Sequence, residues 1–125
     1  MSRAGGSIRW RFGAGGPFER LSARLDAGDA NGVGRLLHAR AVLIIDSGGP
    51  SPIAPVEGRV AVAGGLVGLM TPATTVEPAS INAAPGLVLR HDEQVVAAVT
   101  ARVRWGLLTR VWAVNNPDKL RHWNR

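Results

Sequence analysis

Apolar residues near the start of the chain recur at the spacing of one helix face. Phe18, Leu21 and Leu25 follow Pro17, a residue that suits the first turn of a helix. Gly28 comes directly after this run and suits a C-terminal end. The pattern therefore predicts a first helix that begins near residue 17 and ends before residue 28.

A second short helix is expected after this break. Asp29 resembles an N-cap, and Val33, Leu36 and Leu37 lie on one side of the helix that would follow it. Two glycines inside this segment each weaken a helix by about 1 kcal/mol relative to alanine. The second helix therefore depends on packing against the rest of the domain.

The middle of the chain predicts one strand and one further helix. Residues 41–45 form an apolar run that enters the turn-rich sequence of residues 46–52. In residues 58–70, Val62 and Leu66 lie on one helix face, although three glycines weaken this helix in isolation.

From residue 74 onward the apolar pattern has the period of a β-strand. Four such runs are separated by short spacers, at residues 74–81, 86–91, 95–103 and 107–114. Short spacers favour hairpins, and four strands joined in this way make an antiparallel meander. The order of helices, strand, helix and meander predicts an α+β fold, with the helices packed on one face of a curved sheet.

Length and composition indicate one globular domain. The 125 residues are 46% apolar and 19% charged, a balance that argues against intrinsic disorder. Residues 1–16 are rich in glycine and arginine and lack the apolar core of a secretory signal. We expect a flexible leader over residues 1–16 and a single domain over residues 17–125.

The net charge of +6 is weak evidence for nucleic-acid binding. Fourteen of the fifteen basic residues are arginine, a bias typical of a GC-rich genome, and three of them lie in the leader at Arg3, Arg9 and Arg11. The remaining residues contain no stripe of clustered arginines interleaved with aromatic residues. We therefore expect no direct nucleic-acid binding.

The sequence also argues against several other kinds of site. Cysteine is absent, which excludes disulfides and thiolate metal ligands and suits a cytoplasmic protein. No apolar stretch approaches the roughly 20 residues of a membrane span, and His38, His91 and His122 show no metal-ligand spacing. We expect no membrane association, no metal and no cofactor.

The order of elements resembles the SnoaL-like (nuclear-transport-factor-2-like) fold, a cone of curved antiparallel sheet closed by helices around a pocket. Four segments also resemble motifs in the C-terminal extension of extracytoplasmic-function sigma factors: the Gly28-Asp29 break, the Asp-Ser-Gly-Gly turn of residues 46–49, the hairpin of residues 82–88 and the Asn-Pro-Asp-Lys-Leu sequence of residues 116–120. Ser47 and Ala83 replace glycines of the family, which puts any positive φ there in doubt. The promoter-binding regions of such factors are not among these residues, so we expect either a piece of a longer protein or a free-standing relative.

The resemblance implies a non-enzymatic regulatory or ligand-sensing interaction domain. On this hypothesis a sigma factor or RNA polymerase region contacts two motifs, made of Asp46, Gly48, Gly49, Asn116, Pro117, Asp118, Lys119 and Leu120. Superfamily members often pair through the sheet face, so we also expect a homodimer.

The superfamily also contains pocket enzymes, and the alternative hypothesis is a small isomerase or cyclase with Asp46 as general base. The position of Asp46 favours the role of a turn residue that caps the amides after it over that of a base. An apolar small molecule is the expected ligand of a pocket lined by Asn82, Thr100, Trp105 and Trp112, residues that ordinary turn, strand and core roles also explain.

Overall fold

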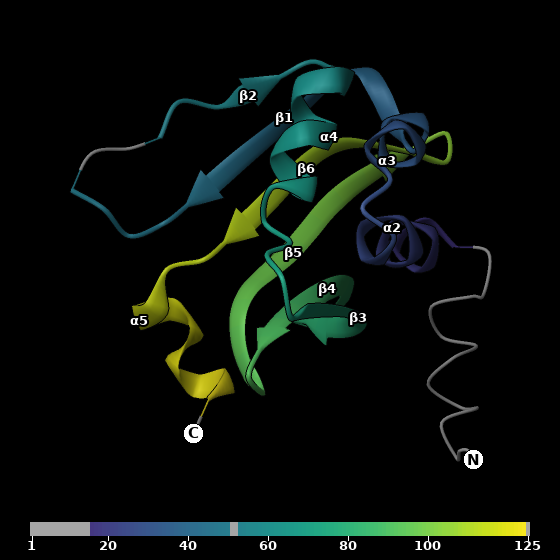
Figure 1. Cartoon of the computed structure of the whole chain (residues 1–125). Helices are drawn as coiled ribbons and strands as arrows, with labels where there is room; N and C mark the ends of the chain where they lie inside the picture. The colour runs from purple at the N-terminus through teal and green to yellow at the C-terminus, as the bar shows by residue number, and fades with distance from the viewer. Residues whose placement is uncertain (1–15, 51–52, 125) are drawn as a thin grey trace, which may run out of the picture.

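The computed structural model describes residues 16–50 and 53–124. Its elements contain the predicted order of two helices, a strand, a helix and a meander, with a short strand β2 and two short C-terminal helices, α5 and η1, that were not predicted (Figure 1). They are α2 (Pro17–Asp26), α3 (Ala30–Arg35), β1 (Leu37–Asp46), β2 (Val56–Glu57), α4 (Arg59–Val67), β3 (Thr74–Ile81), β4 (Ala84–His91), β5 (Gln94–Arg104), β6 (Leu107–Val114), α5 (Pro117–Leu120) and the 3-10 helix η1 (Arg121–Trp123). Within these described ranges, no helix has the length and apolar character needed to cross a membrane. The predicted leader, residues 1–16, lies outside the described residues except for Gly16.

The first helix begins and ends where the sequence predicts, and the second begins there but ends at Arg35, before Leu36 and Leu37. Phe18, Leu21 and Leu25 form the buried face of α2. Gly28 takes a φ of +67° in the break between the helices. The Oδ1 atom of Asp29 then accepts a hydrogen bond of 2.9 Å from the backbone N–H of Gly32 and so caps α3.

In the part of the chain that the structure describes, six strands form one sheet in the order β2-β1-β6-β5-β4-β3. Strands β3 to β6 make the predicted antiparallel meander. Strand β1 pairs with β6 in parallel, from Val42 opposite Arg110 to Asp46 opposite Val114. This parallel pairing joins the first half of the chain to the meander.

Strand β1 is longer than the apolar run predicts, because it starts at Leu37 and not at residue 41. Leu37 was expected on the second helix. The backbone N–H of Leu108 donates a 2.8 Å hydrogen bond to the carbonyl of Leu36, so pairing with β6 begins there. Half-exposed and exposed residues follow at positions 38–40, which hides this start from the apolar pattern.

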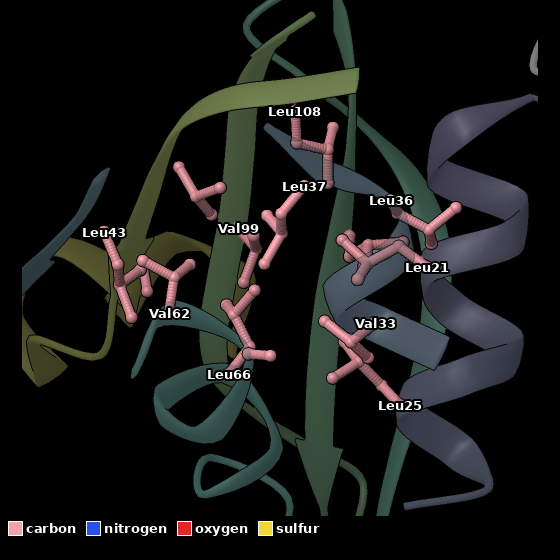
Figure 2. Packing of buried hydrophobic residues seen from close by; sticks show 14 of the residues in the cluster. Leu21, Leu25, Val33, Leu36, Leu37, Leu43, Val62, Leu66, Val99 and Leu108 are labelled. Carbon is pink, nitrogen blue, oxygen red and sulfur yellow. The ribbon is translucent and has the colours of Figure 1, made fainter. Parts of the chain in front are cut away.

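The core lies between the three helices and one face of the sheet. Helix α2 packs on β3 and β4, and α4 packs on β1. The space between the layers is filled by buried leucine and valine side chains from both sides (Figure 2), among them Leu21, Leu25, Val33, Leu37, Leu43, Val62, Leu66, Val99 and Leu108. The predicted α+β architecture is confirmed.

The opposite face of the sheet is partly covered by the C-terminal segment. Leu120 of α5 is 3% exposed and packs in a second cluster with Val88, Val95 and Ala98. The sheet therefore has a main core under the helices and a smaller one under α5 and η1.

The three hairpins of the meander have turns of two residues, and both residues of each turn have positive φ. Asn82 and Ala83, with φ values of 52° and 66°, connect β3 to β4. Such pairs are typical of the type I′ turn, which matches the twist of the strands. The spacer is therefore two residues and not the four predicted, and β4 starts at Ala84. Ala83 adopts a left-handed conformation although it has a Cβ.

The turn at Ala83 yields a stability prediction. We expect Ala83→Gly to raise the free energy of unfolding by about 0.5–1 kcal/mol, because alanine in the left-handed region costs roughly 1–2 kcal/mol and part of the gain is offset by the freer unfolded chain. Urea unfolding measures the change. The matched control Ala84→Gly lies in β4 opposite Ile81 and should instead destabilise the protein. Equal effects of the two substitutions would contradict the account.

Candidate functional site

The two motifs that resemble sigma-factor extensions lie side by side, just beyond the ends of two neighbouring strands of the sheet. Strands β1 and β6 run in parallel and end together, with Asp46 opposite Val114. The backbone N–H of Asn115 donates a 3.0 Å hydrogen bond to the carbonyl of Asp46, which continues the pairing one residue further. The chain segments that follow the two strands therefore leave the sheet next to each other.

Asp46 and Lys119 connect these two segments directly. The Nζ atom of Lys119 donates a 2.5 Å hydrogen bond to Oδ2 of Asp46. The Oδ1 atom of Asp46 accepts a 3.2 Å bond from the backbone N–H of Gly48, so the carboxylate also closes its own turn. The side chain of Asp46 is 35% exposed and that of Lys119 is 63% exposed, so the pair lies at the surface.

The C-terminal motif is held in place at both of its ends. The Oδ1 atom of Asn116 accepts a 3.1 Å bond from the backbone N–H of Asp118 and caps α5, and Pro117 occupies the first turn. Leu120, at the end of the motif, is buried against the sheet. Arg121 adds a 2.6 Å bond to Asp118.

Gly48 is the position at which the two segments approach most closely. Its φ is +80°, and a Cβ added there would lie 2.6 Å from side-chain atoms of Asn116. Both the backbone conformation and the space therefore require glycine. A Cβ on Gly49 would meet only the hydroxyl of Ser47, at 3.9 Å. The positive φ falls on Gly48, so Ser47 in place of a glycine costs nothing in this turn.

We call the surface formed by residues 46–49 and 116–120 the interaction patch. Its two segments are far apart in the sequence. Seven of the eight residues predicted for the interaction motif are at least partly exposed here, and the eighth, Leu120, is buried beneath them. A hollow of about 230 Å³ adjoins the Asp46 turn and has an apolar side formed by Ile44, Ile45 and Ile53. The patch thus combines a fixed ion pair with a neighbouring apolar depression.

The environment of Asp46 favours its charged form. The hydrogen bond from Lys119 is the main reason that the pKa of Asp46 lies below its ordinary value of 3.8. Desolvation acts in the opposite direction, while the charge of Lys119 and the hydrogen bonds from Gly48 and Asn116 lower the pKa further. A general base needs a pKa near the working pH. This geometry therefore suits an ion-paired turn residue better than the predicted base.

The structure does not bring together all four residues predicted to line a pocket. Asn82 and Trp105 lie in the turns of two different hairpins, and Trp105 is 82% exposed. Thr100 and Trp112 are cross-strand partners in β5 and β6. Val111 and Ala113 belong to the main core, so the alternation along β6 puts Trp112 on the other face of the sheet. Asn82 and Trp105 therefore do not form walls of the predicted cavity.

Three further polar residues have environments that the sequence did not reveal. Asn124 closes the C-terminal segment onto β5: its Oδ1 accepts a 2.7 Å bond from Val95 N–H, and its Nδ2 donates a 3.0 Å bond to the Val95 carbonyl. His91 and Asn115 each bury a side-chain atom without a hydrogen-bond partner among the described residues. The sequence assigns no site role to either residue. In the described ranges, no three histidine or acidic side chains are grouped as metal ligands would be.

The ion pair predicts a measurable titration of Asp46. We expect its carboxyl carbon, followed by NMR, to titrate below pH 3.8, and Lys119→Met to move the midpoint back toward that value. Because the folded pKa is lowered, the stabilisation is fully present above pH 4 and is lost as the pH falls through the folded pKa. Arg90→Met is the control, since it breaks an exposed 2.9 Å ion pair with Glu77 in the far edge strand. If Lys119→Met left the titration midpoint of Asp46 unchanged, Lys119 would not be the cause of its lowered pKa.

The close approach at Gly48 predicts different effects of two neighbouring substitutions. Gly48→Ala should destabilise the protein by about 1–2 kcal/mol, because the new Cβ takes a left-handed conformation and displaces Asn116. Gly49→Ala should change stability by less than about 0.5 kcal/mol. Thermal unfolding compares the two, and the Asp46 titration should shift only in Gly48→Ala. Similar losses in both variants would show that Asn116 is not in contact with this turn.

The chain was compared with protein-family models, curated protein sequences and solved structures. The chain matches no protein-family model and no curated protein sequence. Among solved structures, it is similar to the Mycobacterium tuberculosis extracytoplasmic function sigma factor SigJ, with 26% identity and a TM-score of 0.61 over 82% of this chain. The match spans 42% of the sigma factor's own length.

Two further structures share the fold at lower identity. An NTF2-like protein of unknown function from Mesorhizobium loti is 15% identical, with a TM-score of 0.60 over 78% of this chain and 86% of its own. An LEH-like epoxide hydrolase from M. tuberculosis is 15% identical, with a TM-score of 0.50 over 85% of this chain and 84% of its own. The chain therefore has the NTF2-like, or SnoaL-like, fold, and it is similar to the C-terminal region of an extracytoplasmic function sigma factor.

Proposed function

We propose that the chain is a non-enzymatic regulatory domain that binds a sigma-factor or RNA polymerase region through the interaction patch. The observation that carries the proposal is the bond between Lys119 and Asp46, which fixes two motifs of sigma-factor type into one surface. The partner is shifted between two states to the extent that it binds the patch better in one of them.

The patch has the features of a preorganised binding surface. The turn of residues 46–49 is closed by Asp46 and Gly48, and α5 is capped by Asn116 and anchored by Leu120. Ordering these segments costs nothing at the moment of binding, since they are already fixed in the free protein. The charged atoms of Asp46, Asp118 and Lys119 stay accessible to a partner. These charges orient a bound partner, and the hollow beside Ile53 provides apolar surface that binding can bury.

The alternative function, an isomerase or cyclase with Asp46 as base, has less support. Proton abstraction calls for a carboxylate in an apolar cavity with a pKa raised toward neutrality. Asp46 lies at the surface, pairs with Lys119 and has a lowered pKa. The space between the helices and the sheet is packed with aliphatic side chains. Both observations favour an interaction domain.

A chimera provides the experimental test. The region of SigJ that matches this chain is replaced by residues 17–125, and in vitro transcription from a promoter served by SigJ is measured. We expect the chimera to behave like intact SigJ and unlike SigJ lacking that region. Asp46→Lys in the chimera should shift activity at least fivefold toward the truncated form, because it replaces the ion pair with two like charges.

The reciprocal exchange separates recognition from folding. Asp46→Lys combined with Lys119→Asp restores an ion pair but reverses the charges that the patch presents. Lysine at position 46 cannot accept the hydrogen bond from Gly48, so we expect this double variant to stay folded with a slightly lowered unfolding temperature and to lose regulation. The control exchanges Glu77 and Arg90, an exposed pair in the far edge strand and its neighbour, and should leave regulation intact. If the double variant regulated transcription as the unmodified chimera does, recognition through these charges would be refuted.

A further inference from the structure

Three arginine side chains gather on the open face of the sheet next to the β5–β6 hairpin, at the opposite end of β6 from α5 (Figure 1). Arg102 of β5 lies directly opposite Arg110 of β6, and Arg104 follows two residues further along β5. Alternate residues of a strand share one face, and Ala98 of the same series packs under α5 in the second cluster. All three arginines are exposed on that face. We call them, together with Trp105 of the turn, the arginine surface.

The charges of these arginines are not neutralised within the protein. In the described ranges, no acidic side chain forms an ion pair with any of the three. Glu57 is in the same cross-strand row, but Val42 lies between it and Arg110, so the backbones are two strand spacings apart, about 9–10 Å. Like charges directly opposite each other destabilise a sheet. The pairing of Arg102 with Arg110 is therefore unfavourable in the free protein, and a bound anion would relieve it.

Trp105 adds an aromatic ring beside these charges. It lies in the turn between β5 and β6 and is 82% exposed. The guanidinium carbon of Arg104 is 5.8 Å from the centroid of its ring, so the ring lies next to the arginines. Trp112, two residues after Arg110 in β6, is a half-buried second ring on the same face. The surface thus presents cations and aromatic rings together.

Arginines and exposed aromatic rings on an open sheet are the groups that bind single-stranded nucleic acid. Guanidinium groups bind phosphates, and exposed rings stack on unpaired bases. An acidic peptide would use the charges but would leave Trp105 without a role. A duplex presents its base edges only inside grooves, which a sheet face does not enter. We propose that the arginine surface binds a single strand of nucleic acid, with phosphates on the three arginines and a base stacked on Trp105.

The chemistry of the arginine surface treats DNA and RNA alike. Arginine and tryptophan side chains only donate hydrogen bonds. Nothing in the surface therefore accepts the proton of a ribose 2′-hydroxyl, the group by which proteins distinguish RNA from DNA. The occupant is defined by its phosphates and its unpaired bases.

The expectation of no nucleic-acid binding depended on the arrangement of arginines along the sequence. Pairing of β5 with β6 instead brings Arg102 and Arg110 together across the sheet. The arginine surface contains neither Asp46 nor Lys119, so this inference goes beyond the proposed function and does not depend on it.

The first test measures the fluorescence anisotropy of a labelled oligodeoxyuridylate of about 15 nucleotides, titrated with the full chain at several salt concentrations. Arg102→Gln with Arg110→Gln is compared with Arg24→Gln with Arg90→Gln, which removes the same net charge from two arginines that have acidic partners. Each phosphate contact of a single strand contributes about 0.7 to the dependence of log affinity on log salt. We expect the first variant to lose about 1.4 of this slope and to raise the Kd at least about fivefold, and the second to change neither. The arginines of residues 1–16 are present in every variant and cancel from the comparison.

The second test isolates base stacking. An abasic oligomer of equal length has the same phosphates and no bases, and the unmodified chain should bind it at least about fivefold more weakly. Trp105→Asn should reduce this difference, because it removes the ring while asparagine suits the φ of +52° at this turn position. An oligoribouridylate should bind within about twofold of its deoxy counterpart, since the surface does not read the 2′-hydroxyl.

Thermal unfolding separates binding from folding. The Arg102 and Arg110 double variant should unfold at the same temperature as the unmodified chain or higher, because it removes two like charges that face each other. A weaker affinity in this variant is therefore not the result of a damaged fold.

Three results would overturn the inference. Equal losses in the two double variants would mean that only net charge matters. Equal affinity of the unmodified chain for the abasic oligomer would exclude stacking on Trp105, and equal affinity for a polyglutamate peptide would indicate an acidic protein partner instead. These outcomes are distinguishable from failure of the proposed function, because none of them involves Asp46, Lys119 or regulation of transcription.

Discussion

The parallel pairing of β1 with β6 is the constraint on which the rest of the structure depends. The meander would otherwise end with β6 as an unpaired edge strand, and no backbone pairing would join the first half of the chain to it. Paired parallel strands finish at the same end of a sheet. The register that places Asp46 opposite Val114 therefore also determines which segments meet beyond the ends of the two strands. The residues after β1 and after β6 are those of the interaction patch. The pairing that completes the sheet therefore also assembles the surface to which we assign a function.

Several contacts hold the C-terminal segment in place beside the end of β1. Leaving β6, the chain turns through Asn116 into α5, and it is fixed at three points: Lys119 on Asp46, Leu120 in the second core, and Asn124 on the backbone of Val95. Surface ion pairs alone contribute little to stability. Here the exposed pair acts together with a buried anchor and a two-bond amide contact, which hold the backbone around α5 and so keep Lys119 within reach of Asp46. This combination explains how an exposed lysine stays in one place above the Asp46 turn.

The sequence predicts the elements of the fold well because their causes are local. The apolar face of α2, the cap at Asp29 and the four strands of the meander each depend on residues within a few positions of one another. The parallel partner of β1 does not, since nothing near Leu37 or residue 41 encodes a register with β6. The turn at Ala83 was misjudged for a related reason: the strong pairing of β3 with β4 holds an alanine in a conformation that its own preference opposes. The resemblance named the eight residues of the patch, but only the pairing of β1 with β6 brings their two segments together. The burial of one side-chain atom each of His91 and Asn115 depends on packing between distant segments, which no local pattern predicts.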